Sequence, residues 1–428
     1  MKQKVVIIFL LAGIILTVGN LQYKEVYGLL SKQYIYAKGK NVTKEQKKES
    51  EDIPKQPFEE ENDKEILNLY ALSACLMDAS NGRVLYEKDA NQQMPMASTT
   101  KIMTLLVTLE NANLNDVVTV SSNAAKQPDV QLNMNTGDQY YLKDLIYSLM
   151  LESHNDTAVA IAEHVGGSVE IFCDMMTQKA KSIGALQTRF ETPNGLDADG
   201  HYTTASDLAL IGSYAIKNEE FVKIITTQTH QFNEITTGRS FTVNNKDRFL
   251  YMMEGAIGIK TGFTGKAGYC FVGALRHDGK NFVSVVLGSG WPPNKNYKWA
   301  DTKKLMELGL KNYTEQVVFS PIPEYRLVAV HGGIFADTMT QVNEEVSLLL
   351  CDNDFVQVEF ELPEQLNAPV VAGEKVGEAK IYINKMLYQS IPITAKNTVK
   401  QMDYSYCIDC ILNWFFFQNL KNINEISN

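Results

Sequence analysis

The order of hydrophobic patterns along the chain is the feature that most constrains its fold. Two strand-like runs, 71–77 and 83–86, flank turn residues at 78–82 and predict a β-hairpin. Apolar residues then recur at helical spacing in three segments, and two further runs are rich in β-formers. The helices are expected to begin near Thr99, Asn155 and Thr204, and the strands to cover 269–275 and 282–287. Strands followed by helices and then by strands predict an α/β (α+β) domain built on an antiparallel sheet.

The chain beyond residue 314 changes to short β-like runs separated by turn residues, which predicts a small β-rich domain over 315–395. The runs are 326–330, 345–350, 356–362 and 379–383. In the last segment, 396–428, an apolar stretch from Tyr404 to Leu420 carries one polar stripe. This pattern predicts an amphipathic helix on a membrane surface, with a helix packed on the β domain as the alternative.

The N-terminal residues predict export. Two lysines precede an uninterrupted apolar run at 5–18, so residues 1–19 are interpreted as a signal peptide that is either cleaved or kept as an anchor. Residues 20–66 follow as a charged linker whose composition cannot bury enough apolar surface to fold. The main domain is therefore expected at 67–314, either secreted or on the outer face of the cell membrane.

Composition excludes several classes of function. The 428 residues carry a formal net charge of -10 with no stripe rich in Lys and Arg, which argues against a nucleic-acid partner. The six cysteines are scattered and do not have the spacing of a disulfide framework. Cys407 and Cys410 form a CxxC pair, but no second pair or histidine cluster completes a zinc site. No metal ion and no cofactor is therefore expected.

A serine and a lysine three residues apart, in the segment Ser98-Thr99-Thr100-Lys101, form the first candidate catalytic pair. Both side chains project from one face of a helix start, about one turn apart. A buried lysine can lose its charge at neutral pH and take the proton of a neighbouring hydroxyl, which activates the serine as a nucleophile. Alone the pattern is weak, because a capping serine and a solvated lysine often have the same spacing.

Two further motifs strengthen this interpretation. Ser153-His154-Asn155 precedes the second helix, and Lys260-Thr261-Gly262 lies at the start of a strand-like stretch running into residue 269. Each has an ordinary explanation: Ser153 as a helix cap, Asn155 as a turn residue, and Lys260 as an exposed charge at a strand edge. Together, SxxK, SxN and KTG in this order form the motif set of penicillin-binding proteins and class A β-lactamases.

The chain from about residue 72 to 310 resembles the catalytic domain of the D-alanyl-D-alanine carboxypeptidase family, the low-molecular-weight penicillin-binding proteins. Besides the three motifs, the matching stretches are Met77-Asp78-Ala79, Gly195-Leu196-Asp197, His201-Tyr202-Thr203-Thr204 and Lys266-Ala267-Gly268-Tyr269. The resemblance implies a penicillin-binding-protein/β-lactamase-like transpeptidase domain, with helices on an antiparallel sheet, followed by the small all-β domain.

The resemblance also implies the catalytic roles. Ser98 is the expected nucleophile that holds the acyl-enzyme, and Lys101 is its general base. Ser153 relays a proton to the leaving amine. The backbone N–H groups of Ser98 and Phe263 form the oxyanion hole, a device worth about 3–4 kcal/mol per donor in other hydrolases. Because Phe263 contributes only its backbone, its side chain is free to vary.

The remaining matched residues are expected to bind substrate. Asn155 hydrogen-bonds the acyl chain of the peptide, while Lys260 and Thr261, followed by Gly262, hold the terminal carboxylate. Lys298 stands where relatives commonly place an arginine that assists carboxylate binding. A lysine binds as a point charge without the bidentate fork, so weaker selection of the carboxylate is expected.

A second departure from the family is His154, which occupies the middle of the SxN motif where relatives more often have a small residue. It predicts a cleft that is narrower or that carries a pH-dependent charge. Neither departure removes a catalytic group.

The implied activity is removal of the terminal D-alanine from peptidoglycan stem pentapeptides ending in D-Ala-D-Ala, with β-lactam antibiotics as acylating inhibitors. One alternative is a catalytically silent protein that binds peptidoglycan or senses β-lactams, although the completeness of the motifs argues against it. The other is a serine β-lactamase, which needs a glutamate-activated water. Glu163 is the candidate, but it lies inside a helical run without the expected loop around it.

Overall fold

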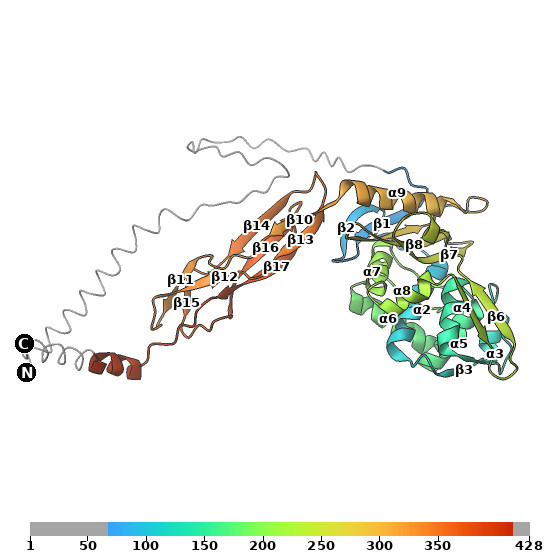
Figure 1. Ribbon diagram of the computed structural model, residues 1–428, viewed down its shortest axis with the longest axis horizontal. Helices are drawn as coiled ribbons and strands as arrows, with labels where there is room; N and C mark the ends of the chain where they lie inside the picture. Colours follow the sequence, from blue (N-terminus) through green and yellow to red (C-terminus); the bar gives the residue numbers. More distant parts are fainter. Residues whose placement is uncertain (1–66, 414–428) are drawn as a thin grey trace, which may run out of the picture. The chain divides into compact units, whose positions relative to one another are not determined.

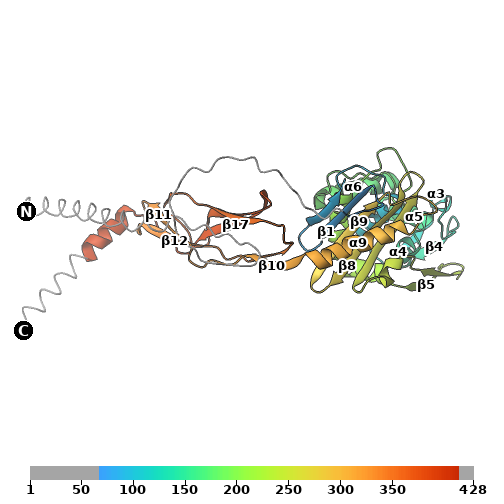
Figure 2. The same ribbon diagram turned by 90° about the horizontal axis from the view of Figure 1, so that it is seen from above.

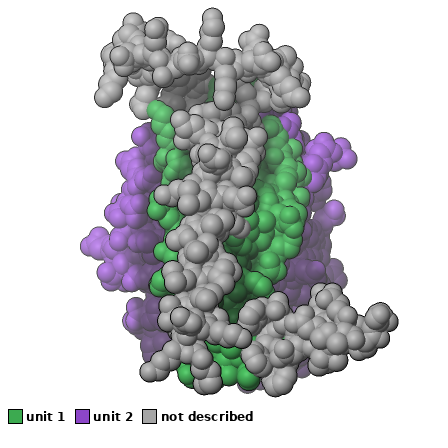
Figure 3. Space-filling view, turned by 90° about the vertical axis from the view of Figure 1, so that its left-hand side faces the viewer, with its two compact units in different colours: residues 1–59, 315–428 green, residues 60–314 purple. Residues whose placement is uncertain are grey.

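The computed structural model describes residues 67–413, which divide into two compact units, 67–314 and 315–413 (Figure 3). The expected signal peptide, the charged linker and the end of the tail lie outside the described residues. Among the helices of residues 67–413, none is long and apolar enough to cross a membrane.

The first unit is built on a five-stranded antiparallel sheet in the order β2-β1-β9-β8-β7. Its strands are β1 (Ser73–Asp78), β2 (Arg83–Lys88), β7 (Ala256–Thr264), β8 (Gly268–His277) and β9 (Lys280–Leu287). The pairing of β1 with β9 joins the beginning of the unit to its end, and β7 lies at an edge of the sheet. The predicted antiparallel sheet is therefore confirmed.

Helices cover both faces of this sheet (Figures 1 and 2). One face carries α2 (Lys101–Asn111), α4 (Leu142–Leu151), α5 (Asn155–Gly166), α6 (Val169–Ile183), α7 (Ala205–Ala215) and α8 (Glu219–Thr226), and the other carries α9 (Tyr297–Asn312). Successive strand residues point to opposite faces. The successive β9 residues Phe282 and Val283 accordingly face different helices. A Cβ atom on Gly309 of α9 would lie 3.0 Å from Phe282, and one on Gly212 of α7 would lie 3.1 Å from Val283.

Helix α2 lies inside the helical layer and carries the SxxK lysine at its first position. All eight residues from Lys101 to Thr108 are buried, and the helix packs against α4, α5, α6, α7 and α8. It is preceded by a 3-10 turn, η2 (Ala97–Thr100), which packs against β7. The candidate serine therefore lies where the helical layer meets the edge strand of the sheet.

The KTG motif lies in the interior of β7, which corrects the expectation that it starts a strand running into residue 269. The strand begins at Ala256 and ends at Thr264, and a turn at 265–267 separates it from β8. The two strands pair as a hairpin in which Gly262 faces Cys270. A short turn between two runs of β-formers is easily missed in the sequence, because hydrophobic alternation continues on both sides of it.

The helices α4, α6, α8 and α9 were not predicted, and neither were several short elements of the first unit. The short elements are α3 (Ser122–Ala125) and two hairpins, β3 (Val117–Thr119) with β4 (Gln139–Tyr141) and β5 (Thr229–Asn233) with β6 (Ser240–Asn244). Strands of three to five residues leave too few alternations for a pattern to register.

The second unit contains a six-stranded sheet in the order β14-β16-β17-β12-β11-β15 and a separate pair, β10 with β13. The strands are β10 (Thr314–Phe319), β11 (Leu327–His331), β12 (Asp337–Gln341), β13 (Val346–Leu350), β14 (Val356–Glu361), β15 (Gln365–Asn367), β16 (Lys375–Ile383) and β17 (Met386–Ala395). Four were expected, and β10, β12, β15 and β17 were not. The folded chain continues beyond Ala395, because Val399 is buried in a cluster with Val330 and Val370. Residues 404–413 then form a helix.

Candidate active site

The Lys101 amine is the centre of the candidate site. The residue is fully buried, and its Nζ lies 3.0 Å from Ser98 Oγ, 2.9 Å from Asn155 Oδ1 and 2.5 Å from the backbone oxygen of Asn194. Three of the predicted site residues, Ser98, Lys101 and Asn155, thus lie in one cluster, and the contact between Lys101 and Asn155 was not itself predicted. Asn194 was not predicted, because it takes part through a backbone carbonyl that any residue has.

The hydrogen bonds of Asn155 determine which atom it presents to the lysine. Its Nδ2 donates to the carbonyls of Pro128 and Asp129, each at 3.1 Å, so the amide oxygen must face Lys101. The oxygens of Asn155 and Asn194 can only accept hydrogen bonds. A neutral amine has two N–H donors for these two oxygens, which leaves its lone pair directed at Ser98 Oγ.

The electrostatic surroundings favour that neutral amine. Burial lowers the pKa of Lys101 well below its ordinary value, and the nearby charge of Lys260 lowers it further. Asp156 opposes this shift, but its carboxylate already accepts backbone N–H groups of Leu132 and Asn133, each at 3.0 Å. Asp156 therefore fixes the loop beside Asn155 while the lysine remains able to accept a proton.

The backbone at Ser98 is held between two glycines. A Cβ atom on Gly195 would lie 2.0 Å from the carbonyl oxygen of Ala97, and one on Gly262 would lie 3.0 Å from the backbone nitrogen of Ser98. Ala97 itself has a positive φ of 48°, a conformation that is strained for a residue with a side chain. The backbone at Ser98 can be packed this closely only because neither Gly195 nor Gly262 has a Cβ atom.

Ser153 also has a strained backbone, with a φ of 71° between α4 and α5. It does not cap α5, because the N-cap position is taken by His154. Its Oγ is buried and has no hydrogen-bond partner among the described residues. An unpartnered buried hydroxyl costs about 1–3 kcal/mol. This hydroxyl is therefore available to a group that enters the site.

Lys260 is a second buried amine. Burial lowers its pKa to about 8, and the opposing effect of Asp247 keeps it from falling further. Asp247 is also buried, with one oxygen accepting the N–H of Phe249 at 2.9 Å and the other unpartnered among the described residues. Burial raises the pKa of Asp247 to about 7, while Lys260 and Lys298 lower it. Lys260 thus carries a positive charge at neutral pH, whereas the nearby Lys101 does not.

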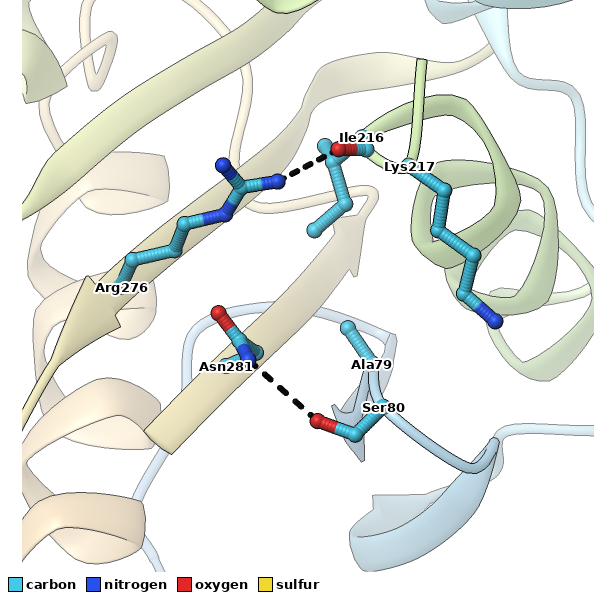
Figure 4. Close-up of a pocket in the computed structure, with 6 residues that line it drawn as sticks. All are labelled: Ala79, Ser80, Ile216, Lys217, Arg276 and Asn281. Atoms are coloured by element: carbon cyan, nitrogen blue, oxygen red, sulfur yellow. Dashed lines mark hydrogen bonds between the residues drawn. The ribbon is translucent and has the colours of Figure 1, made fainter. Parts of the chain in front are cut away.

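A small pocket elsewhere in the first unit is shown in Figure 4. Its volume is about 140 Å³, and it is lined by Ala79, Ser80, Ile216, Lys217, Arg276 and Asn281. Arg276 donates to the carbonyl oxygen of Ile216, and Asn281 donates to Ser80 Oγ. The pocket is smaller than the roughly 300 Å³ typical of small-molecule sites. The Lys101 cluster is therefore the candidate active site.

Residues 58–290, more than half of the chain, match the family model described as D-alanyl-D-alanine carboxypeptidase. The chain belongs to this family. It is accordingly a hydrolase of the serine-peptidase class, as the sequence predicted. The D-alanyl-D-alanine carboxypeptidase family acts on peptidoglycan stem peptides and binds β-lactams, and its members are periplasmic or cell-wall enzymes.

Individual members of the carboxypeptidase family show the same similarity. D-alanyl-D-alanine carboxypeptidase DacF of Bacillus subtilis is 29% identical over 342 residues, covering 78% of this chain and 87% of that protein. The carboxypeptidase of Streptomyces sp. strain K15 is 32% identical over 255 residues, covering 56% and 87%. The crystal structure of penicillin-binding protein 5 from Haemophilus influenzae has a TM-score of 0.66 at 26% identity, covering 78% and 99%. Residues 344–401 match the C-terminal domain of penicillin-binding protein 5, so the predicted fold class is confirmed in both units.

Lys298, which was predicted to take the place of a carboxylate-binding arginine, is held by its own surroundings. Its amine donates to the carbonyl of Lys295 at 2.9 Å and lies over the rings of Tyr269 and Trp299 at 4.6 and 4.8 Å from their centroids. Burial lowers the pKa of Lys298 to about 8, and Asp247 opposes the shift. Its charge is therefore linked to that of Lys260 through a shared counter-ion.

His154 does not alter the carboxypeptidase cleft, which corrects the sequence-based expectation. The residue is buried, with Nδ1 2.8 Å from Ser148 Oγ and Nε2 3.3 Å from a carboxylate oxygen of Glu152. Burial lowers the pKa of His154, so the ring is neutral at pH 7. Sequence cannot reveal which way a side chain at a helix start is directed, and here it packs against α4.

The glycine at position 195 provides a test of the close packing at Ser98. Replacing Gly195 by Ala should lower kcat/KM by at least a hundredfold, because the new Cβ atom would displace the Ala97 carbonyl and with it the nucleophile. Gly167→Ala is the matched control, since Gly167 also has a positive φ but has nothing within 4 Å of an added Cβ. That control should cost only about 1–2 kcal/mol of stability. Equal activity in the two variants would contradict the packing argument.

Proposed function

We propose that this protein removes the terminal D-alanine from peptidoglycan stem peptides by a serine mechanism, with Ser98 as the nucleophile. The observation that carries the proposal is the Lys101 amine, which is buried, has a lowered pKa and is hydrogen-bonded to Ser98 Oγ at 3.0 Å. Two acceptors occupy its N–H donors, so its lone pair is available to the hydroxyl proton. This is the arrangement that a serine nucleophile without a histidine base requires.

In the proposed acylation, Lys101 takes the proton of Ser98 as Oγ attacks the carbonyl carbon between the two D-alanines. The negative oxygen that forms is bound by the backbone N–H groups of Ser98 and Phe263. The C–N bond then breaks as the Ser153 hydroxyl gives its proton to the departing amine and takes up the proton held by Lys101, which leaves Lys101 neutral again and the acyl group on Ser98. Water attacks the ester in a second step, with Lys101 again as base. The unpartnered Oγ of Ser153 supports this relay.

Substrate binding is assigned to groups whose charge and position suit a peptide with a free C-terminus. Lys260, Thr261 and Gly262 lie on β7 beside the Ser98 turn, where the Lys260 charge attracts the terminal carboxylate. Lys298 adds a second positive charge near the same strand. Asn155 has its amide engaged with Lys101, so we propose that it contacts the acyl chain only after local rearrangement or through its remaining lone pair.

A β-lactamase activity is not supported by the position of Glu163. It lies eight residues after Asn155 in α5, about 12 Å along the helix axis. One of its carboxylate oxygens accepts the amide of Asn123 at 2.8 Å. A glutamate directed at a neighbouring helix cannot activate water for the acyl-serine. β-Lactams are therefore proposed as acylating inhibitors that are released slowly.

We further propose that the enzyme is exported through residues 1–19, that residues 67–314 form the catalytic domain, and that residues 396–428 include a segment that binds the membrane surface. The described start of this segment supports the last point, because the helix at 404–413 exposes Tyr404, Ile408, Ile411 and Leu412.

The central test is release of D-alanine from a diacyl-L-Lys-D-Ala-D-Ala tripeptide. Ser98→Ala should abolish both release and labelling by a fluorescent penicillin, and Lys101→Ala should lower the acylation rate by at least a thousandfold. Lys143→Ala, at an exposed position on α4, is the control and should leave both unchanged. Penicillin labelling of the wild type without any D-alanine release would favour the silent sensor instead.

The pKa of Lys260 predicts the alkaline limb of the activity profile. Because Lys260 is charged below about pH 8 and neutral above it, kcat/KM for a peptide with a free carboxylate should fall as the pH rises through about 8. Asp247→Asn removes the group that raises this pKa, so the fall should move to lower pH. A peptide with an amidated C-terminus is the control. An identical fall with the amide would show that the limb does not report carboxylate binding.

Membrane attachment can be tested with enzyme lacking residues 1–19. This protein should co-sediment with phospholipid vesicles, and removal of residues 404–428 should abolish binding without changing D-alanine release. The cut follows Asp403, because Val399 and Met402 still pair with the β unit. Replacing Ile408, Ile411 and Leu412 by Gln keeps the length and should weaken binding similarly. Retained binding after the cut would refute a membrane role for this segment.

A further inference from the structure

A chain of hydrogen bonds leads from a buried histidine to the peptide group in front of Ser98. The backbone N–H of Glu191 lies 3.0 Å from His201 Nδ1, and His201 Nε2 lies 2.9 Å from Thr100 Oγ1. Thr100 Oγ1 lies 2.8 Å from the carbonyl oxygen of Ala97. His201 and Thr100 are both buried. No step of the acyl-enzyme mechanism uses either side chain.

The partners determine the direction of every bond in this chain. The N–H of Glu191 can only donate, so His201 Nδ1 must accept, and the ring hydrogen lies on Nε2. A carbonyl can only accept, so the single hydrogen of the Thr100 hydroxyl is given to Ala97. Thr100 Oγ1 must therefore accept the hydrogen of His201 Nε2. Burial lowers the pKa of His201 to about 4, so the ring is neutral near pH 7 and keeps this tautomer.

The Ala97 carbonyl and the Ser98 N–H belong to the same peptide group. In a trans peptide they point in opposite directions, so fixing the oxygen also fixes the direction of the N–H. The oxygen faces Thr100 and Gly195, whereas the Ser98 nitrogen faces Gly262 on the KTG strand. The strained φ of Ala97 favours rotation of this peptide group, and the hydrogen bond to its carbonyl oxygen opposes that rotation.

We propose that His201 and Thr100 are positioning residues that aim and polarise the Ser98 N–H at the oxyanion of the tetrahedral intermediate. The inference rests on the proposed function, because it needs an oxyanion at that place. Hydrogen bonds in series polarise one another, and a carbonyl that accepts a strong bond makes the N–H of the same peptide a better donor. The pair therefore contributes more to the transition state than to bound substrate, and its loss lowers kcat rather than raising KM.

A purely structural role makes a different prediction. A threonine that bonds the carbonyl three residues back is common at helix starts, and a buried histidine can simply satisfy its neighbours. In that case removal lowers the stability of the fold without a specific effect on acylation. A split between kcat and KM, and a loss of affinity confined to a tetrahedral inhibitor, distinguish the two roles.

The test compares disruptive and conservative variants of the full chain. Thr100→Val removes the hydroxyl at constant shape, while Thr100→Ser keeps it. His201→Asn retains an acceptor near Nδ1 but cannot reach Thr100, whereas His201→Gln can place a donor near Nε2. His164→Asn, at an exposed histidine of α5, is the control. The measurements are kcat and KM for D-alanine release, the rate of acylation by fluorescent penicillin, the inhibition constant of a peptide boronic acid, and the unfolding midpoint.

Thr100→Val and His201→Asn should each lower kcat and the acylation rate by at least tenfold with KM changed less than threefold. They should also weaken the binding of the boronic acid, which forms a tetrahedral adduct, by a similar factor. Thr100→Ser and His201→Gln should stay within about threefold of the wild type. In the double variant, His201→Asn should add nothing to Thr100→Val, because it acts through Thr100. If Thr100→Val does not fold, the His201→Asn and His201→Gln pair carries the test.

Disruptive variants that fold and acylate within twofold of the wild type would overturn the inference, as would additive losses in the double variant or a change confined to KM. A wild type that neither releases D-alanine nor reacts with penicillin would instead overturn the proposed function, and this inference with it. The two failures are distinguished by the activity of the unmodified enzyme.

Discussion

The Lys101 amine has no contact with bulk water, and the rest of the site is arranged around that constraint. A buried amine favours its neutral form, and a second buried amine nearby, Lys260, strengthens the preference. Asp247 prevents both lysines from becoming neutral, because its carboxylate supports the charge of Lys260. The two lysines thus differ in protonation because Asp247 raises the pKa of Lys260, whereas the opposing effect of Asp156 on Lys101 does not offset the effect of burial.

The geometry of the nucleophile depends on backbone packing more than on side chains. The Ser98 turn lies between the helical layer and the edge strand β7, with Gly195 on one side and Gly262 on the other. Ala97 and Ser153 keep strained conformations that an isolated segment would leave. The packing of the Ser98 turn against β7 and α2 holds the conformation of Ala97 at the border between the two layers.

Sequence reasoning found the groups whose geometry is local. Ser98 and Lys101 are one helical turn apart, so their contact follows from the spacing. Hydrophobic periodicity identified the helices α2, α5 and α7 and several strands, but it missed α4, α6, α8, α9 and β17. Sequence reasoning missed Asn194 and the His201 contact with Thr100, because these partners lie 93 and 101 residues apart in the sequence and Asn194 acts through a carbonyl. It also missed Asp247, because the sequence does not show that this carboxylate is buried near Lys260. Strands as short as β15 left no pattern. The roles of the three motifs came from the family, since spacing alone permits an ordinary helix cap and a surface lysine.

Burial of a neutral lysine has a consequence for the folding of this enzyme. In the unfolded chain Lys101 is protonated at neutral pH, whereas its folded pKa lies well below the ordinary value, so folding releases a proton. The associated loss of stability is absent above the ordinary lysine pKa, grows as the pH falls below it, and levels off beneath the lowered value. The burial that lowers the pKa of Lys101 therefore couples folding to proton release, and it makes the fold less stable at neutral pH than a solvent-exposed lysine at this position would.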